Sequence, residues 1–326
     1  MVPSNNTRHY TLKENYMKKK YIIALLIILS LFSAGLLFVG NYFYNLAINP
    51  YTSKDSIFGE DDDNGLEVKE DTKWLEKKSG YEDVYLTSFD NLKLHGYKII
   101  NENKTNKWAI VVHGYTSEGK LVSSKAKHLY DMGYNILVPD LRSHGQSEGK
   151  YIAMGWDDRL DIIDWVNSII DSDKDAEIIL HGTSMGAATV LMASGEKLPS
   201  NVKSIVADCG YTSVWDEFTH QLKALYNLPS FPVLNASSIV TKFKAGYWLG
   251  EASALEQVKK SETPILYIHG DKDDFVPYYM MDELYENTKS EKEKLTIKDA
   301  GHAEGDLVDP KLYWSTVENF LNKYVK

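Results

Sequence analysis

From Tyr81 to the end of the chain, the apolar and polar positions form two kinds of pattern, one typical of strands and one typical of helices. Short β-rich runs are expected as strands at Glu82–Ser88, Leu92–Ile100, Trp108–Val112, Asn135–Val138, Glu177–Leu180, Val202–Ala207 and Ile265–Ile268, with a weaker one at Leu295–Ile297. Helix-length stretches lie between them at Ser123–Met132, Trp156–Ile170, Ser184–Glu196, Tyr278–Asn287 and Pro310–Tyr324. Continuous apolar strands that alternate with helices predict an α/β fold, with a mostly parallel sheet covered on both faces. The first two runs meet at the turn-forming pair Asp90-Asn91, so we expect them to form an antiparallel edge hairpin.

One interval, at about residues 212–263, breaks this alternation. It is rich in aromatic side chains and is interrupted by Pro229 and Pro232. An insertion of this kind at the ends of strands is typical of a lid over a binding site.

The apolar run Tyr21–Phe43 contains no charged residue. As a helix it is roughly 30 Å long or slightly longer, about the hydrocarbon thickness of a bilayer. Lys18, Lys19 and Lys20 precede it and acidic residues follow, so the positive-inside rule predicts a cytoplasmic tail at 1–20 and an extracellular body. A cleaved signal peptide is the rival interpretation, but the run is long for one, and Asn45-Leu46-Ala47 lacks a small residue at its first position.

Residues 44–80 are polar and acidic, and we expect them to form a linker or stalk between the membrane segment at 21–43 and a domain at 81–326. The net charge of -10 argues against a nucleic-acid partner, because binding phosphates requires clustered lysine and arginine. Cys209 is the only cysteine, so an intrachain disulfide and a cysteine-rich metal framework are both excluded. We expect no metal and no organic cofactor.

The segment Gly182-Thr183-Ser184-Met185-Gly186 has the spacing G-x-S-x-G between a predicted strand and a predicted helix. In that setting the serine is held in a strained conformation with its hydroxyl above the sheet, and bulky side chains at 182 or 186 would collide with the neighbouring elements. Ser184 is therefore the candidate nucleophile.

A serine hydroxyl needs a histidine to accept its proton and a carboxylate to orient that histidine. Three carboxylates, Asp271, Asp273 and Asp274, follow the strand at Ile265–Ile268, and His302 lies near the C-terminus. The chain order serine, aspartate, histidine is the one used with a nucleophile on a strand-to-helix turn.

Four other histidines have simpler explanations. His113, His181 and His269 each precede a glycine at a predicted strand end, where we expect a buried ring hydrogen-bonded to loop backbone. His144 is expected in a loop near the site, with no part in proton transfer.

From about residue 81 to 326 the chain resembles the α/β-hydrolase superfamily. The matching segments are His113-Gly114, Asp140–Gly149 (DLRSHGQSEG), GTSMG at the nucleophile, Gly270–Pro277 (GDKDDFVP) and Gly301–Gly305 (GHAEG). In detail it is similar to bacterial serine hydrolases of the prolyl-oligopeptidase-like or serine-aminopeptidase-like type, many of which act as esterases.

The resemblance implies the α/β-hydrolase fold with a helical lid, and it assigns further roles. The family pattern G-x-x-D-x-x-V-P falls on Gly270 and Asp273, which selects Asp273 as the orienting carboxylate. The position of His302 between the last strand and the last helix is the one that the superfamily uses for its base. The backbone N–H of Met185, with that of Tyr115 after His113-Gly114, would form the oxyanion hole.

These residues predict a serine hydrolase that cleaves carboxylic esters or amides through an acyl-enzyme, with a small-molecule ester or peptide as substrate. An extracellular aminopeptidase or oligopeptidase with the same triad is the alternative, and Asp216, Glu217 and Glu251 of the lid could hold a substrate ammonium group, although lid carboxylates are usually solvated. A remoter alternative is a non-catalytic binding module on a hydrolase scaffold.

Overall fold

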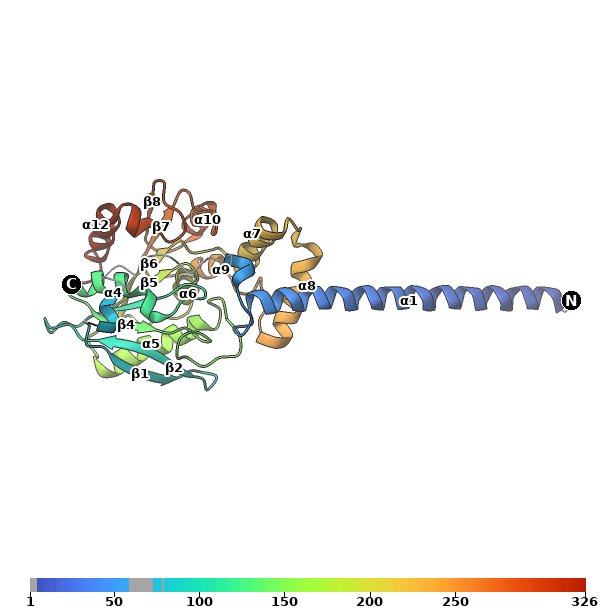
Figure 1. Cartoon of the computed structure of the whole chain (residues 1–326), viewed down its shortest axis with the longest axis horizontal. Coiled ribbons are helices and arrows are strands. Elements are labelled where there is room, and N and C mark those ends of the chain that lie inside the picture. The colour runs from blue at the N-terminus through green and yellow to red at the C-terminus, as the bar shows by residue number, and fades with distance from the viewer. Residues whose placement is uncertain (1–4, 59–72, 78) are drawn as a thin grey trace.

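The computed structural model describes residues 5–58, 73–77 and 79–326. Within that part of the chain, eight strands form one sheet in the order β1-β2-β4-β3-β5-β6-β7-β8 (Figure 1). The strands are β1 (Glu82–Thr87), β2 (Lys93–Ile99), β3 (Lys107–Val112), β4 (Asn135–Pro139), β5 (Glu177–Thr183), β6 (Val202–Asp208), β7 (Ile265–Gly270) and β8 (Lys292–Ile297). β1 and β2 form the antiparallel edge, and the strands from β4 to β8 run parallel. The α/β architecture and its edge hairpin are as the sequence predicts.

Side-chain alternation along the strands divides the interior into two layers. In β3, Trp108, Ile110 and Val112 pack on one face of the sheet, whereas Ala109 and Val111 pack on the other. The first face is covered by α5 (Asp158–Ser172), α6 (Met185–Ser194), α9 (Ala254–Val258) and α10 (Tyr279–Asn287). The second is covered by α3 (Trp74–Lys77), α4 (Ser123–Asp131) and α12 (Pro310–Leu321). Short helical turns at η2 (Gly119–Val122) and α11 (Gly305–Val308) connect these elements.

The expected lid at 212–263 contains two helices that project from the body, α7 (Val214–Tyr226) and α8 (Ser230–Ala245) (Figure 1). We call these two helices the lid. The third helix of the interval, α9, packs against α6 and α10 and so belongs to the body. Ser213 caps α7 by accepting a hydrogen bond from the Asp216 backbone N–H, and Asn227 ends it in the left-handed conformation.

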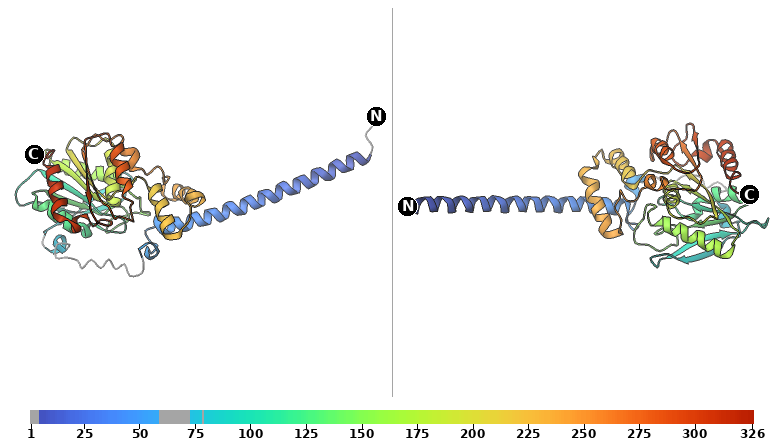
Figure 2. Two further views of the ribbon diagram at one scale, coloured as in Figure 1. Left: turned by 90° about the horizontal axis from the view of Figure 1, so that it is seen from above. Right: turned by 180° about the vertical axis from the view of Figure 1, so that it is seen from behind.

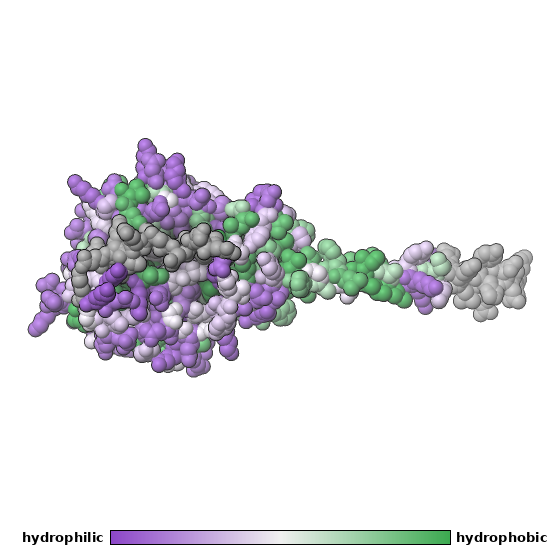
Figure 3. All heavy atoms as spheres, viewed as in Figure 1, coloured by the Kyte–Doolittle hydropathy of each residue, from purple (hydrophilic) through white to green (hydrophobic). Residues whose placement is uncertain are grey.

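The long helix α1 (Asn5–Ala47) extends away from the domain, with its N-terminal half out of contact with the body (Figures 1 and 2). Its apolar window lies within Tyr16–Ala47, which is long and apolar enough to cross a bilayer. Figure 3 shows hydrophobic side chains along this helix and continuing onto the adjoining part of the domain.

The expected linker at 44–80 differs at both of its ends from a free stalk. Tyr44, Leu46 and Ile48 are buried against the domain, and the Ile152 N–H donates to the Ile48 carbonyl at 2.8 Å. At the other end, Trp74 and Leu75 of α3 are buried against α4. Between them, α2 (Asp55–Phe58) is a single helical turn. The acidic run that suggested a stalk lies outside the described residues. Both contacts are made by apolar residues within a segment that is polar on average. The average composition of the segment therefore did not reveal them.

Candidate active site

The turn between β5 and α6 places the Ser184 hydroxyl at the carboxyl edge of the sheet. Ser184 has φ 57° and ψ -119°, a left-handed backbone that a non-glycine residue adopts only under strain. A Cβ on Gly182 would lie 2.2 Å from the Gly186 carbonyl oxygen, and one on Gly186 would lie 2.3 Å from the carbonyl oxygen of Val112. Both glycines are therefore required by close backbone approach, as the sequence pattern predicts.

The three side chains singled out in the sequence lie together at this edge. The Nε2 atom of His302 is 2.8 Å from Ser184 Oγ, and its Nδ1 atom is 2.8 Å from Asp273 Oδ2. The three residues come from the turn after β5, the loop after β7 and the loop after β8. Parallel strands bring these loops to one edge, which explains how residues up to 118 positions apart meet.

The Asp273 carboxylate is fixed by more than His302. Its Oδ1 accepts backbone hydrogen bonds from Phe275 at 3.0 Å and Val276 at 2.9 Å, while His269 Nε2 lies 3.0 Å from Oδ2. Burial raises the pKa of Asp273, but the hydrogen bonds from His269 and His302 outweigh it and lower the pKa to about 2. The group is therefore a carboxylate at any physiological pH.

The sequence predicts a hydrogen bond from His269 to loop backbone, and Nε2 does lie 2.9 Å from the Val276 carbonyl oxygen. Its contact with Asp273 is an addition that the sequence did not reveal. The spacing of four residues between them was visible, but spacing alone does not show which way a loop folds.

The remaining candidate histidines have structural partners. His113 accepts from the Leu141 backbone N–H at 3.0 Å, and His181 Nε2 lies 3.1 Å from the Tyr313 hydroxyl. His144 Nδ1 lies 3.0 Å from the Arg142 carbonyl oxygen, and burial lowers the pKa of His144 to about 3. His113 and His144 bind loop backbone, whereas His181 differs from the expectation because its partner is a side chain of α12.

Two backbone segments flank the nucleophile. Met185 opens α6, and the first N–H groups of a helix have no acceptor within it, so they are available to an anion. On the other side, a Cβ placed on Gly114 would lie 3.4 Å from the Ser184 Cβ, so the backbone at Gly114 is close to the nucleophile. Tyr115 follows it, and its hydroxyl donates to the Ala47 carbonyl of α1 at 2.7 Å. Tyr115 thus links the candidate site to the long helix.

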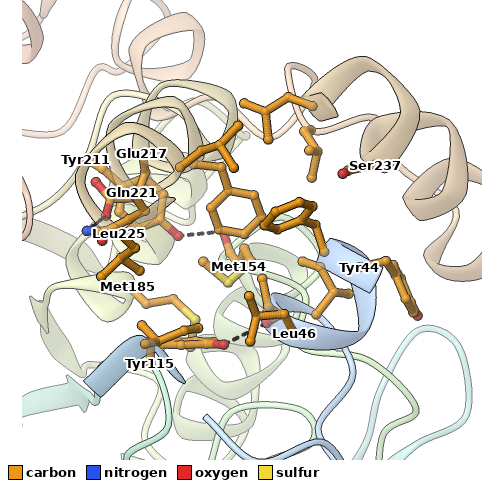
Figure 4. Close-up of a pocket in the computed structure, with 18 of the residues that line it drawn as sticks. Tyr44, Leu46, Tyr115, Met154, Met185, Tyr211, Glu217, Gln221, Leu225 and Ser237 are labelled. Atoms are coloured by element: carbon orange, nitrogen blue, oxygen red, sulfur yellow. Dashed lines mark hydrogen bonds between the residues drawn. The ribbon is translucent and has the colours of Figure 1, made fainter. Parts of the chain in front are cut away.

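Two cavities meet at Ser184. The first encloses about 800 Å³ counting its mouth, lies under the lid and is lined mainly by apolar side chains (Figure 4). Its wall comes from the end of α1, from the lid and from the body around Tyr115 and Met185. The second encloses about 950 Å³ and is more polar, with Ser117, Lys125 and Asp306 in its wall.

Lys125 lies in a buried polar network beside the second cavity. Its Nζ is 2.9 Å from Asp306 and 3.9 Å from Asp208, and the Tyr313 hydroxyl donates to Asp208 at 3.0 Å. Burial lowers the pKa of Lys125, but Asp306 and Asp208 raise it by more than burial lowers it. The net pKa lies above its ordinary value, so the ammonium stays charged. No sequence pattern connected these residues.

The three carboxylates singled out in the interval 212–263 lie in three different environments. Asp216 accepts from the Thr212 and Ser213 hydroxyls at the start of α7, and Glu251 is exposed beside Lys242. Glu217, in contrast, is 3% exposed and lines the first cavity. One of its oxygens accepts from Gln221 at 2.9 Å, whereas the other is buried without a hydrogen-bond partner. Burial raises the pKa of Glu217 to about 8. The general expectation of a solvated lid carboxylate is wrong for this residue.

One group of possible metal ligands occurs in the described part of the chain. Atoms of Cys209, Asp273 and His302 lie within 4.8 Å of one another. Asp273 and His302 are already paired with each other, and burial raises the pKa of the Cys209 thiol well above its ordinary value, which opposes the thiolate that a metal needs. The group fits the hydrogen-bonded arrangement around Ser184 better than a metal.

Comparison with known proteins agrees with this fold. Residues 108–232 match the alpha/beta hydrolase fold family. The protein YqkD of Bacillus subtilis (strain 168) is 31% identical over 279 residues, which cover 85% of this chain and 89% of the relative. The chain belongs to the alpha/beta hydrolase family.

Other similar proteins include a membrane protein and solved structures. A Saccharomyces cerevisiae protein named as a membrane protein is 25% identical over 244 residues, 74% of this chain and 79% of its own length. The Pyrococcus furiosus esterase Pf2001 superposes with a TM-score of 0.62 at 29% identity, covering 76% of this chain and 93% of that one. The Pyrococcus horikoshii acylaminoacyl peptidase, at 17% identity and a TM-score of 0.54, covers 74% of this chain and 40% of that one, and shares the fold.

Proposed function

We propose that this hydrolase is a membrane-tethered serine esterase that works through an acyl-enzyme. The observation that carries the proposal is the continuous hydrogen-bonded chain from Ser184 through His302 to Asp273, at the meeting point of two cavities. An ester has two substituents on its carbonyl, and two cavities around one hydroxyl suit such a substrate.

In the proposed first step, Ser184 Oγ attacks the ester carbonyl carbon while its proton passes to His302 Nε2. The oxyanion accepts hydrogen bonds from the Met185 and Tyr115 backbone N–H groups. The bond from carbon to the alcohol oxygen then breaks as His302 returns the proton to that oxygen. Water, deprotonated by His302, attacks the acyl carbon of the acyl-enzyme. The bond from that carbon to Ser184 Oγ then breaks as His302 returns the proton to Oγ, which releases the acid and restores Ser184. Asp273, held as a carboxylate, orients the ring and stabilises its charged form.

The test of this proposal is a comparison of the wild-type chain with Ser184→Ala. We expect the variant to lose about 10⁴-fold or more in kcat/KM for p-nitrophenyl esters, as removal of a triad nucleophile does elsewhere. A fluorophosphonate probe should label the wild type and leave the variant unlabelled. Unchanged ester hydrolysis in Ser184→Ala would reject the mechanism, and a wild type that neither reacts with the probe nor hydrolyses any ester would favour a binding module.

A second candidate activity, removal of N-terminal residues from peptides, is favoured by Glu217. This carboxyl lines the first cavity and leaves one oxygen without a partner. A substrate ammonium group could bind there and stabilise the carboxylate form that burial alone disfavours. Aminoacyl p-nitroanilides distinguish the activities. An aminopeptidase would hydrolyse them faster than esters of the same size, and Glu217→Gln would raise KM for the anilides while leaving simple esters much less affected.

The tethered state rests on α1 and its flanking charges. Lys18, Lys19 and Lys20 precede the apolar stretch, and we propose that they hold the N-terminus in the cytoplasm with the domain outside the cell membrane. A cysteine introduced on the exposed surface of the domain should react with an impermeant maleimide in intact cells. Reaction only after permeabilisation would indicate the opposite orientation, with the domain in the cytoplasm.

A further inference from the structure

The end of the apolar helix is part of the candidate binding site. Phe43, Leu46, Ala47 and Ile48 line the first cavity, together with lid residues and Ser184 itself. This end of the helix is held firmly, because the Lys54 ammonium donates to the carbonyl oxygens of Leu46 and Asn49, both at 2.7 Å. The cavity is therefore built jointly by the lid and the helix that extends from the domain.

The junction between α1 and α8 is a close helix packing. A Cβ on Gly40 would lie 2.5 Å from the backbone carbonyl carbon of Ala236, so the two backbones touch at this point. Lys244 adds a hydrogen bond to Asn41 Oδ1 at 2.7 Å. Figures 1 and 2 show α8 lying across α1 beside the domain.

The position of Gly40 fixes the depth of this junction. If the span begins at Tyr21, immediately after the lysines, then Gly40 lies roughly 29 Å further along the helix axis at 1.5 Å per residue. This is about the thickness of the hydrocarbon core. In a helix that spans a bilayer in this way, the packing of α8 on Gly40 would place the lid at the opposite boundary, between acyl chains and head groups.

The lid carries an apolar surface suited to that boundary. Ile239 and Phe243 are four residues apart on α8 and so share one face, on which they are 37% and 87% exposed. Phe231, at the start of the same helix, is 73% exposed. Lys242 and Lys244 flank Phe243, a combination typical of a helix that lies in a membrane interface. Continuity with the spanning helix selects a lipid bilayer as the occupant of this surface.

We propose that the substrate is a long-chain acyl ester resident in the bilayer, and that its chain reaches Ser184 from the membrane through the first cavity, beside the end of α1. The second, more polar cavity receives the alcohol part of the ester. This inference rests on the proposed esterase function and adds the substrate class and the direction of access. Because the end of α1 forms part of the wall of this apolar cavity, the acyl chain can pass from the bilayer to Ser184 without exposure to water.

The first test uses the full chain in phosphatidylcholine vesicles with two esters. One is soluble p-nitrophenyl butyrate, and the other is a monoacylglycerol with an eighteen-carbon chain that resides in the bilayer. Leu225→Trp adds a large ring to the wall of the first cavity, whereas Leu228→Trp adds the same ring between the two lid helices, at a residue that does not line the cavity. We expect Leu225→Trp to lower the ratio of monoacylglycerol to butyrate kcat/KM at least tenfold, and Leu228→Trp to change it less than twofold.

The outcomes separate this inference from the function on which it rests. Hydrolysis of butyrate with no hydrolysis of the monoacylglycerol would overturn the inference and leave the esterase proposal standing. An unchanged ratio in Leu225→Trp would also overturn it. Loss of both activities in Ser184→Ala ties both rates to one site, and failure of the wild type to cleave either ester would overturn both proposals.

The second test measures whether the lid touches lipid, independently of catalysis. Cys209 is the only cysteine and is buried, so Phe243→Cys can be labelled selectively with an environment-sensitive fluorophore. Ile100→Cys is the control, because residue 100 is 56% exposed and follows β2 at the sheet edge opposite the candidate site. In vesicles, the label at 243 should shift to shorter wavelength and be quenched by brominated lipid, and the label at 100 should not. The same wavelength shift and the same quenching at both positions would overturn the proposed contact between the lid and the bilayer.

Discussion

The buried carboxyl of Glu217 should make the stability of the domain depend on pH. Its pKa rises from the ordinary 4.5 to about 8 because burial penalises the charged form. A group whose pKa is higher in the folded state contributes its full stability below the unfolded value, and this contribution is lost as the pH rises toward the folded value. Between pH 4.5 and 8, the wild type should therefore lose stability relative to a variant that cannot ionise.

The size of this effect follows from the shift. A difference of 3.5 units between the two states corresponds to about 5 kcal/mol as an upper limit, at 1.36 kcal/mol per unit. Between pH 5.5 and 7.5, the free energy of unfolding of Glu217→Gln minus that of the wild type should grow by about 2 to 3 kcal/mol. Subtraction removes the contribution of every other titrating group, because both proteins share them.

The measurement is urea unfolding of the full chain in a mild detergent, followed by tryptophan fluorescence at several pH values. Glu251→Gln provides the control, since that carboxylate is exposed and paired with Lys242. The reasoning would be refuted by a difference between Glu217→Gln and wild type that stays constant with pH. It would also fail if Glu251→Gln showed the same slope.

Three further substitutions test other parts of the structure. Gly186→Ala should lower the free energy of unfolding by at least about 3 kcal/mol, because its Cβ would meet the Val112 carbonyl, whereas Gly250→Ala, with open space around it, should change it by less than about 1 kcal/mol. Asp273→Asn should lower kcat by about 10⁴-fold with little change in thermal midpoint, and a loss below tenfold would contradict its orienting role. Gly40→Leu should separate α1 from Ala236 and raise protease sensitivity of the lid, whereas Gly35→Leu, which has nothing within 4 Å, is the matched change on the same helix.

Local patterns predicted the parts of the site that local geometry determines. Gly182 and Gly186 could be read from the sequence because a turn from strand to helix leaves no space for side chains at those positions. The strands and the edge hairpin could be predicted because apolar periodicity reports which faces are buried.

Other features depend on contacts between distant parts of the chain, which no local pattern encodes. Lys125 and Asp306 are 181 positions apart and meet only when the loops around the sheet edge come together. Glu217 has the same sequence signature as a solvated residue on an amphipathic helix, and only the packing of α7 buries it. Residues 44–47 are the apolar end of α1, so composition cannot separate the candidate membrane span from the stretch that lines a cavity.

The unbroken passage of α1 into the domain has a consequence for kinetics. Because the backbones of α1 and α8 touch at Gly40 and Ala236, a membrane that held α1 would also fix the orientation of the lid. In the tethered state proposed for this hydrolase, encounters would then occur by lateral diffusion in a plane. Turnover would follow the mole fraction of ester among the lipids, and diluting a vesicle suspension with buffer would leave the rate per enzyme unchanged.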